Sequence, residues 1–276
     1  MDAIITTVDW EDKNWKKELL KFSNSEYGIS FFYDWGFVPF IIKGIRKFMP
    51  FINNIYIVTY NGKSYKDEGV YSISHHDIIP EKLLPTFSSC CIEMFLHKIN
   101  GLDEYYIYFN DDMIPVYPMQ EDFFIKDGKI LSDYKNVNEQ IRGLYRNNLN
   151  NGCKLVGTQY FRPSHNPHCY SKSLAEECFS KYETDIIKSC RFRFRHSFAY
   201  NQYLFEAYQH AKGVVEYRAD YSKIIHVSKI DDLESVPKLL NESKSFVCFN
   251  DYIFEKNCDR SIIVNKLNEL LSNYFK

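Results

Sequence analysis

The sequence predicts an α/β protein, with a mainly parallel sheet flanked by helices and a helical C-terminal half. Three observations predict this class. Short apolar segments typical of buried strands alternate with segments of helical spacing in the first third of the chain. The aromatic segment 105–109 directly follows one such helical segment, and the order strand, helix, strand implies parallel strands. From Pro163 onward, helical spacing dominates.

The first half of the chain is expected to supply most of the sheet. Three predicted strands precede the aromatic one, at 3–8, 54–59 and 70–73. Two helices are also predicted before the aromatic strand, one after the first strand and one after the third. The first covers 36–48, before Pro50, and the second runs from a cap at Ser88 or Ser89 to Gly101.

The second half is expected to be helical, with a few late strands. The segment 136–154 is polar and rich in Asn, which predicts a loop or an exposed inserted helix. The remaining predictions are helices at 171–181, 195–211 and 261–274 and strands at 214–217, 223–226 and 245–249. We therefore expect one catalytic domain over 1–276. Its core sheet would draw on about 1–135 and on late strands from about 214–250, with a helical insertion at about 136–212.

Composition excludes several classes of protein. The chain has 34 basic and 36 acidic residues, so no basic excess indicates a nucleic-acid partner. No apolar run approaches the roughly 18 residues of a transmembrane helix, and the apolar start lacks the cationic segment of a secretory signal. Eight cysteines without a Cys-x-x-Cys pair are typical of buried thiols in a reducing compartment. These features predict a cytoplasmic protein without a transmembrane segment.

Two adjacent carboxylates, Asp111 and Asp112, follow the aromatic strand. A surface turn is the simple interpretation, because Asn and Asp are common turn residues. Ligands of parallel sheets, however, gather at the carboxyl ends of the strands. Paired aspartates there are suited to Mg²⁺ or Mn²⁺ bound together with phosphate groups, because hard cations prefer oxygen ligands.

Other acids and histidines are candidates at similar positions. Asp9 follows the first strand, where a solvated acidic turn is the alternative. Glu93 and His97 lie four residues apart on a predicted helix and would share a face, although a structural histidine is the simpler interpretation. His165 and His168 could bind zinc, but no third nitrogen or sulfur ligand lies at motif spacing, so a general base or phosphate contact is the alternative.

Arginines supply the candidate phosphate contacts. Arg191, Arg193 and Arg195 alternate with phenylalanines, so a strand would put three guanidiniums on one face, whereas a helix would splay them. Further along, Asp251 lies in a second aromatic–Asn–Asp pattern. With paired acids, candidate bases and no Walker or Gly-x-Gly-x-x-Gly loop, these residues favour a nucleotide-sugar site.

In order along the chain, four segments resemble the Stealth family. This family includes bacterial capsular polysaccharide phosphotransferases and the catalytic subunit of the lysosomal-enzyme N-acetylglucosamine-1-phosphotransferase. The four segments are MDAIITTVDWEDKNW; FFYDWGFVPFIIKGIRKFMPFINNIYIVTYNG with LLPTFSSCCIEMFLHKINGLDEYYIYFNDDM; SHNPHCYSKSL through RFRHSFAYNQYLF; and FVCFNDYI. The run from Pro85 to Asp112 is the most specific. Thr7 and Trp10 stand where family members usually have Trp and Gly.

The resemblance implies a Rossmann-like core related to the GT-A type, which binds a UDP-sugar with Mg²⁺ or Mn²⁺. The implied reaction moves hexose-1-phosphate, in particular N-acetylhexosamine-1-phosphate, from the UDP-sugar to a glycan or polysaccharide hydroxyl and releases UMP. The implied setting is capsular or surface polysaccharide synthesis, with peripheral association with a polysaccharide-assembly complex left open. By motif position, the resemblance implies these site residues: Asp9, Asp34, His97, Asp111, Asp112, His165, Arg195, His196 and Asp251.

We assign roles on this basis. Asp111 and Asp112 are expected to bind the metal, and Arg195 to offset charge on the transferred phosphate. His165 is the first choice for the base, and His97, oriented by Glu93, is the second. His196 is also placed in the catalytic group, and the expected donor-binding residues are Asp9, Asp34, Arg193 and Asp251.

Three other functions stay open from the sequence. A glycosyltransferase would use the same donor and aspartates but release UDP. A metal-dependent phosphoesterase would need no acceptor. A glycan-binding module would bind sugars through its tyrosines, and EDTA would not affect this binding.

Overall fold

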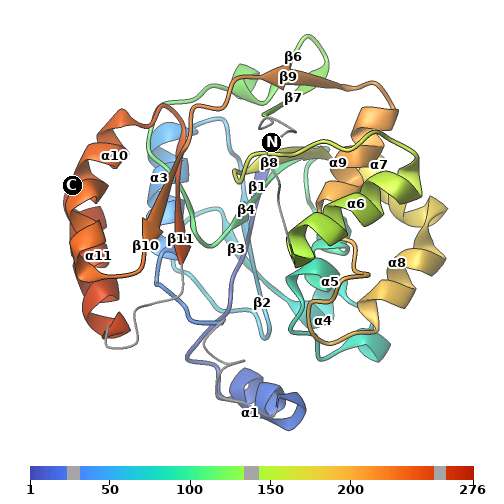
Figure 1. Ribbon diagram of the computed structural model, residues 1–276, viewed down its shortest axis with the longest axis horizontal. Coiled ribbons are helices and arrows are strands. Elements are labelled where there is room, and N and C mark those ends of the chain that lie inside the picture. Colours follow the sequence, from blue (N-terminus) through green and yellow to red (C-terminus); the bar gives the residue numbers. More distant parts are fainter. Residues whose placement is uncertain (24–31, 134–142, 252–258) are drawn as a thin grey trace.

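A five-stranded sheet runs through the centre of the molecule (Figure 1). The computed structural model describes residues 1–23, 32–133, 143–251 and 259–276, with the side chain of Asp251 excluded. The strand order is β3–β2–β1–β4–β8. The bounds are Asp2–Thr6 for β1, Ile55–Thr59 for β2, Val70–Ser74 for β3, Tyr105–Asn110 for β4 and His168–Ser171 for β8. The first four strands are parallel, and β8 pairs antiparallel to β4. The predicted class, a mainly parallel α/β sheet, is confirmed.

Two hydrophobic cores lie on opposite faces of this sheet, because successive strand side chains point to opposite faces. In β4, Ile107 and Phe109 belong to one core, whereas Tyr106 and Tyr108 belong to the other. Burial on both faces explains why β1, β2 and β4 consist of nearly continuous apolar residues.

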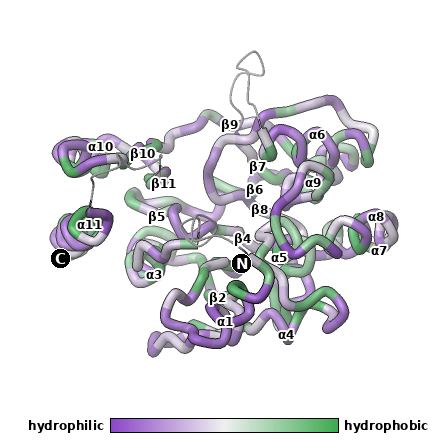
Figure 2. Tube along the Cα trace, turned by 60° about the horizontal axis from the view of Figure 1, so that its bottom comes forward, coloured by the Kyte–Doolittle hydropathy of each residue, from purple (hydrophilic) through white to green (hydrophobic). Residues whose placement is uncertain are grey.

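Helices cover both faces (Figure 1). The first core is packed by α3 (Val38–Phe48), α10 (Val236–Glu242) and α11 (Arg260–Tyr274). The second is packed by α5 (Ser89–Glu93), α7 (Lys172–Lys181), α8 (Glu183–Cys190) and α9 (Tyr203–Ala211), with α6 (Leu144–Val156) outside α9. The remaining helices are α1 (Lys13–Phe22), α4 (His75–Ile78), η1 (Glu81–Leu83), η2 (Leu96–Lys98), η3 (Glu121–Phe123) and η4 (Ile230–Ser235). In Figure 2, α10 and α11 alternate between hydrophilic and hydrophobic colours, as expected for helices with one buried face.

The late strands do not join the central sheet, so that part of the prediction is wrong. β10 (Lys223–Val227) and β11 (Phe246–Asp251) form a second sheet with β5 (Met113–Pro115). β9 (Val215–Arg218) forms a third sheet with β6 (Ile125–Lys126) and β7 (Lys129–Asp133). The fifth strand of the central sheet is instead β8, which lies inside the predicted helical insertion. Short apolar segments indicate strands but do not determine which strands pair.

Two predicted helices are shorter than expected. The segment after Ser88 is helical only as α5, and a 3₁₀ turn, η2, replaces its second half. The helix predicted over 195–211 begins at Tyr203. The polar segment at 136–154 contains α6 from Leu144 onward, and its residues 136–142 lie outside the described part. α1 was not predicted; Asp12 caps it by accepting from the backbone of Asn14 and Trp15.

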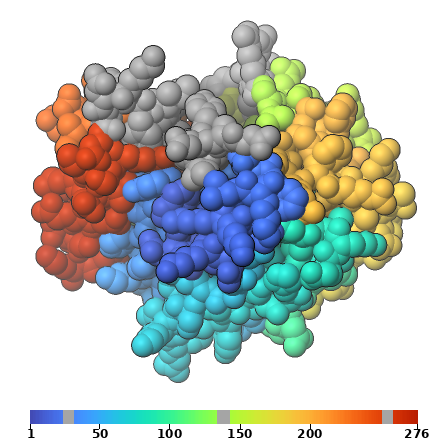
Figure 3. Space-filling model, turned by 90° about the horizontal axis from the view of Figure 1, so that it is seen from below, coloured from blue at the N-terminus to red at the C-terminus, as the bar shows by residue number. Residues whose placement is uncertain are grey.

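The carboxyl ends of β1, β2 and β4 lie on the side of the molecule from which α1 projects (Figure 1). Seen from that side, the N-terminal residues lie on the surface between the C-terminal residues and the 170–210 segment (Figure 3). Among the helices described for this chain, none combines the length and the hydrophobicity that crossing a membrane requires.

Candidate active site

Acidic side chains converge at the carboxyl edge of the central sheet. Asp9 follows β1, and its Oδ1 lies 2.9 Å from the Nζ of Lys63, which follows β2. Asp111 follows β4, and its Oδ2 accepts a 2.8 Å hydrogen bond from the hydroxyl of Thr7. Because parallel strands end at the same edge, residues that follow three different strands become neighbours.

Asp34 adds another carboxylate to this edge. Its Oδ1 accepts from the backbone N–H of Gly36 at 2.7 Å, in a turn where Gly36 has a φ of 73°. Burial raises the pKa of Asp34, and the nearby negative charges of Asp9 and Glu11 raise it further, against the opposing effect of Lys63.

Asp111 is the most perturbed acid of the group. Burial and then the charge of Asp112 raise its pKa to about 7, with Asp34 adding a smaller effect and the bond from Thr7 opposing it. Burial also raises the pKa of the neighbouring Tyr65, followed by the charges of Asp34 and Asp111. The acids therefore repel one another, and a bound cation would relieve this repulsion.

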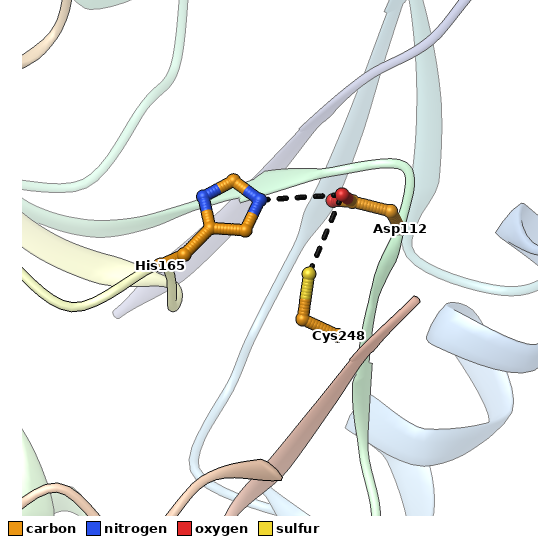
Figure 4. Close-up of side chains that lie close together, drawn as sticks. All are labelled: Asp112, His165 and Cys248. Atoms are coloured by element: carbon orange, nitrogen blue, oxygen red, sulfur yellow. Dashed lines mark hydrogen bonds and ion pairs between the residues drawn. The ribbon is translucent and has the colours of Figure 1, made fainter. Parts of the chain in front are cut away.

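Asp112 lies in a second cluster, with His165 and Cys248 (Figure 4). Its Oδ2 lies 3.3 Å from Nε2 of His165 and accepts from Sγ of Cys248 at 3.4 Å. The other carboxylate oxygen, Oδ1, is buried and has no hydrogen-bond partner among the residues that the structure describes. Within the described residues, this is the one group of His, Cys and acidic side chains whose ligand atoms lie close enough to hold a metal ion, all within 4.8 Å.

Strand pairing brings Cys248 to this place. β5 turns back immediately after Asp112 and pairs antiparallel with β11, with Met113 opposite Cys248. The backbone N–H of Phe249 donates to the carbonyl of Asp112 at 2.9 Å. The backbone of Asp251, at the end of β11, is therefore carried toward the same edge, but its side chain lies outside the described residues.

His165 lies on a loop that is held from behind by buried polar groups. The backbone N–H of Ser164 donates to the carbonyl of Asp133 at 2.9 Å. Nε2 of His168 donates to the carbonyl of Ser164 at 2.9 Å, and Nδ2 of Asn166 donates to Oδ2 of Asp133. These bonds leave little freedom for the loop residue between them, His165.

His168 is an internal ion-pair partner and not part of the Asp112 cluster. Its Nδ1 lies 3.4 Å from Oε1 of Glu206, and the Ser132 hydroxyl contacts both side chains. Burial lowers the pKa of His168, but the charge and hydrogen bond of Glu206 outweigh burial and raise it to about 9. The two histidines therefore do not form the zinc pair that their spacing allowed.

Comparison with known proteins shows which sequences this chain resembles. Residues 31–132 match the profile described as Stealth protein CR2, conserved region 2. The capsular polysaccharide phosphotransferase of Actinobacillus suis is 28% identical over 100% of this chain and 82% of its own length. The receptor polysaccharide phosphotransferase WefC of Streptococcus oralis is 27% identical over 91% of this chain and 90% of its own length. The chain therefore resembles the Stealth family over residues 31–132, and capsular and receptor polysaccharide phosphotransferases over most of its length.

The region that matches this profile contains Asp34, Lys63, Asp111 and Asp112. A solved structure of the galactosyltransferase LgtC, in complex with donor and acceptor sugar analogues, aligns over 99% of this chain and 96% of its own. Its TM-score is 0.47 at 9% identity.

His97 does not lie where its predicted role requires. It is 0% exposed, its ring packs against Phe179 and Phe205, and neither ring nitrogen has a hydrogen-bond partner among the described residues. Burial lowers its pKa to about 3, with Lys98 and Lys172 acting in the same direction. A neutral imidazole enclosed by phenylalanines is a core residue, so the structure does not support His97 as a base.

Glu93 does not orient His97, and that prediction is wrong. The α-helix ends at Glu93, so the two residues do not share a helical face. The Glu93 carboxylate instead accepts from the backbone N–H of Gln202 at 2.9 Å.

The arginine segment forms neither a strand nor a helix start, and two of its predicted site residues hold the chain in place. Arg193 donates to the carbonyl of Pro85 at 2.5 Å, and its guanidinium lies 4.2 Å from the ring centroid of Phe22. His196 donates from Nε2 to the carbonyl of Ser189 and accepts at Nδ1 from the backbone of Phe198. Both ring nitrogens are therefore occupied by backbone groups, which contradicts a catalytic role for His196.

Arg195 is exposed, as is Arg191 at the start of the segment. Burial raises the pKa of Glu93 and of Tyr108, and the charge of Arg195 opposes this rise in both. The charge of Asp111 adds to the rise in the pKa of Tyr108. Arg195 thus lies within electrostatic range of Tyr108 in β4, and its phosphate role stays a prediction.

The sequence analysis did not identify two polar residues of the candidate site, or the thiol beside Asp112. Lys63 follows β2 as Asp9 follows β1, so the strand-end rule could have found it. Thr7 was noted only as a departure from the family pattern, yet it bonds Asp111. Cys248 carries no sequence signal, because its place depends on the pairing of β11 with β5.

Proposed function

We propose that this protein transfers hexose-1-phosphate, in particular N-acetylhexosamine-1-phosphate, from a UDP-sugar to a glycan hydroxyl. UMP is released, and the transfer serves capsular or surface polysaccharide synthesis. The observation that carries the proposal is the convergence of Asp9, Asp34, Asp111 and Asp112 at one sheet edge, with His165 bonded to Asp112. The names of the phosphotransferase relatives support the same reaction.

The residues at this edge fit a hard divalent cation, Mg²⁺ or Mn²⁺. The charge of Asp112 raises the energy of the charged form of Asp111, and one buried oxygen of Asp112 has no partner within the described residues. A bound cation would use these oxygens and remove both penalties. When bound, such an ion neutralises the oxygens of a diphosphate, which favours attack at phosphorus.

His165 is the proposed general base. When Nε2–H donates to Oδ2 of Asp112, the lone pair lies on Nδ1, which can take a proton from the acceptor hydroxyl. The hydroxyl oxygen then bonds to the phosphorus nearest the sugar. The bond from that phosphorus to the bridging oxygen breaks, and UMP leaves with the bridging oxygen.

Charged groups around the acids bind the remaining parts of the donor. Asp9 and Asp34 can accept hydrogen bonds from hydroxyls of the ribose or the sugar. Arg195 offsets charge on the transferred phosphate, and Lys63 adds a second positive charge at the same edge. Asp251 stays a predicted donor contact. Arg193 and His196 are not proposed to touch the donor, because their side chains hold the protein backbone.

The products of the reaction test this function. The protein is incubated with Mg²⁺, a panel of UDP-sugars and oligosaccharide repeats of the surface polysaccharide of its own source organism. The released UMP and UDP are then separated by chromatography. We expect UMP, with rates about a hundredfold or more lower in Asp112→Asn and His165→Gln. Asp122→Asn, an exposed carboxylate in η3, is the matched control and should keep wild-type activity.

Each rival function has a distinct outcome in this assay. UDP as the product would identify a glycosyltransferase. Equal product release without acceptor would identify a phosphoesterase. Glycan binding unaffected by EDTA, with no nucleotide released, would identify a binding module.

A further inference from the structure

The proposed reaction has no use for Cys248, yet this thiol points at its central carboxylate (Figure 4). Cys248 is 0% exposed, and its Sγ lies 3.4 Å from the same Asp112 oxygen that His165 approaches at 3.3 Å. A sulfur, a nitrogen and an oxygen atom that could each bind a metal thus lie close together. The zinc site that the spacing of His165 and His168 allowed lacked a sulfur ligand, and the fold supplies one from another strand.

Two of the three distances between the ligand atoms match the requirements of one tetrahedral ion. Zinc binds nitrogen and oxygen at about 2.0–2.2 Å and sulfur at about 2.3 Å, which separates neighbouring ligand atoms by about 3.3–3.6 Å. The two measured contacts to Asp112 have these lengths, and all three ligand atoms lie within 4.8 Å of one another. Three protein ligands leave the fourth position for water or for a donor oxygen.

The chemistry of the ligands determines which ions bind. Mg²⁺ takes oxygen ligands almost exclusively, so it gains nothing from Cys248. Zinc and related ions favour thiolate and imidazole. The simple alternative is that Cys248 is an ordinary core thiol that donates a weak hydrogen bond, since it also belongs to the first hydrophobic core.

We propose that Asp112, His165 and Cys248 form a binding site for zinc or another thiolate-preferring divalent ion, and that this ion inhibits the transferase. Binding replaces the proton of the Cys248 thiol, which is released to solvent. Ligation through Nε2 of His165 places the ring proton on Nδ1, so His165 can no longer act as a base. The inhibitory part of this inference rests on the proposed function, whereas the binding part does not.

Cobalt reports the site without any assay of activity. The full chain is stripped of metal with a chelator and titrated with Co²⁺. The wild type should develop a near-ultraviolet thiolate-to-cobalt absorption. Cys248→Ser keeps the size of the side chain and its hydrogen-bond donor but loses the thiolate. This variant should therefore not develop the absorption. Cys178→Ser, another fully buried thiol, in α7, is the matched control and should retain the band.

Zinc affinity is measured in competition with a chromophoric chelator. We expect the affinity to fall at least about tenfold in Cys248→Ser, because even outer-shell partners contribute about ten- to a hundredfold. Cys248→Ala repeats the measurement if Cys248→Ser fails to fold. Cobalt binding without thiolate absorption, or equal zinc affinity in wild type and variant, would overturn the site.

Inhibition is then measured at fixed Mg²⁺ with increasing zinc. Measured against its own rate without zinc, Cys248→Ser should need at least about tenfold more zinc for half inhibition. Equal zinc sensitivity in an active variant would overturn the inhibitory role. If neither protein transfers sugar phosphate while the cobalt band is present, the proposed function fails and the metal site stands.

Discussion

At the scale of single residues, two neighbouring threonines at the end of β1 act on opposite faces of the sheet. Thr6 shares a 2.8 Å hydrogen bond with the hydroxyl of Tyr108, which belongs to the second core. Thr7 donates at the same distance to Asp111 in the acidic group. Because strand side chains alternate between faces, adjacent positions of one residue type serve packing and site chemistry separately.

Thr7→Val should lower transferase activity about tenfold, because it removes a hydrogen bond to a charged group, worth about 1.5–3 kcal/mol. Steady-state rates at saturating donor measure the loss. The matched change Thr6→Val should keep the activity and instead lower the free energy of unfolding, measured in urea. The interpretation is wrong if the two variants lose activity equally.

Lys63→Gln should weaken donor binding about tenfold, since its charge neutralises Asp9 and lowers the pKa of Asp34 at the same edge. Calorimetric titration with UDP and Mg²⁺ measures this affinity. Lys66→Gln removes an exposed charge from the same loop and should bind UDP as the wild type does. Unchanged affinity in Lys63→Gln would remove Lys63 from the site.

At the scale of elements, β8 and the loop before it connect the central sheet to His165. The antiparallel pairing of β8 with β4 places His168 opposite Tyr108, beneath the loop. There the buried pair of His168 and Glu206 anchors the carbonyl of Ser164. The stability of this pair therefore also determines how firmly His165 is positioned.

The wild-type advantage in stability over His168→Gln should shrink as the pH rises. The pKa of His168 is about 6.5 in the unfolded chain and about 9 in the folded one. A pKa raised by folding gives stability that is complete below about 6.5 and lost as the pH passes through about 9. Urea unfolding of both proteins at several pH values between these limits measures the difference in stability.

The exposed pair of His76 and Glu81 provides the control for this pH dependence. The free energy of unfolding of His76→Gln should equal that of the wild type at every pH, because a solvated ion pair contributes little to stability. A constant difference between wild type and His168→Gln across the whole range would show that His168 is not charged in the folded protein.

At the scale of the whole molecule, the site joins segments that are far apart in the chain. Asp9 comes from the end of β1, His165 from the loop before β8, and Cys248 from β11. A ligand that contacts these segments together binds only the folded chain and should stabilise all of it.

UDP with Mg²⁺ should therefore raise the melting temperature by several degrees. At about a hundredfold excess over its dissociation constant, a ligand adds about 2.7 kcal/mol, which corresponds to about 5–10 °C for a chain of this size. Scanning calorimetry measures the shift, and EDTA or Asp112→Asn should abolish it. The same shift in EDTA would exclude a metal from donor binding.

The sequence alone determined the central strands and the acids that follow them. β1, β2 and β4 are buried on both faces, so their residues had to be apolar, and this pattern is visible without a structure. Asp9 and Asp111 then follow from the rule that ligands gather at carboxyl ends. The fold also brings His165, the predicted base, to 3.3 Å from Asp112.

Only the tertiary structure decided what each histidine and Cys248 does. His97, His165 and His168 have the same side chain, but phenylalanines enclose the first, Asp112 bonds the second and Glu206 charges the third. Cys248 reaches Asp112 through the pairing of β11 with β5, across 136 residues of sequence. The physical reason is that burial and strand pairing are set by contacts between distant segments, which local residue patterns do not encode.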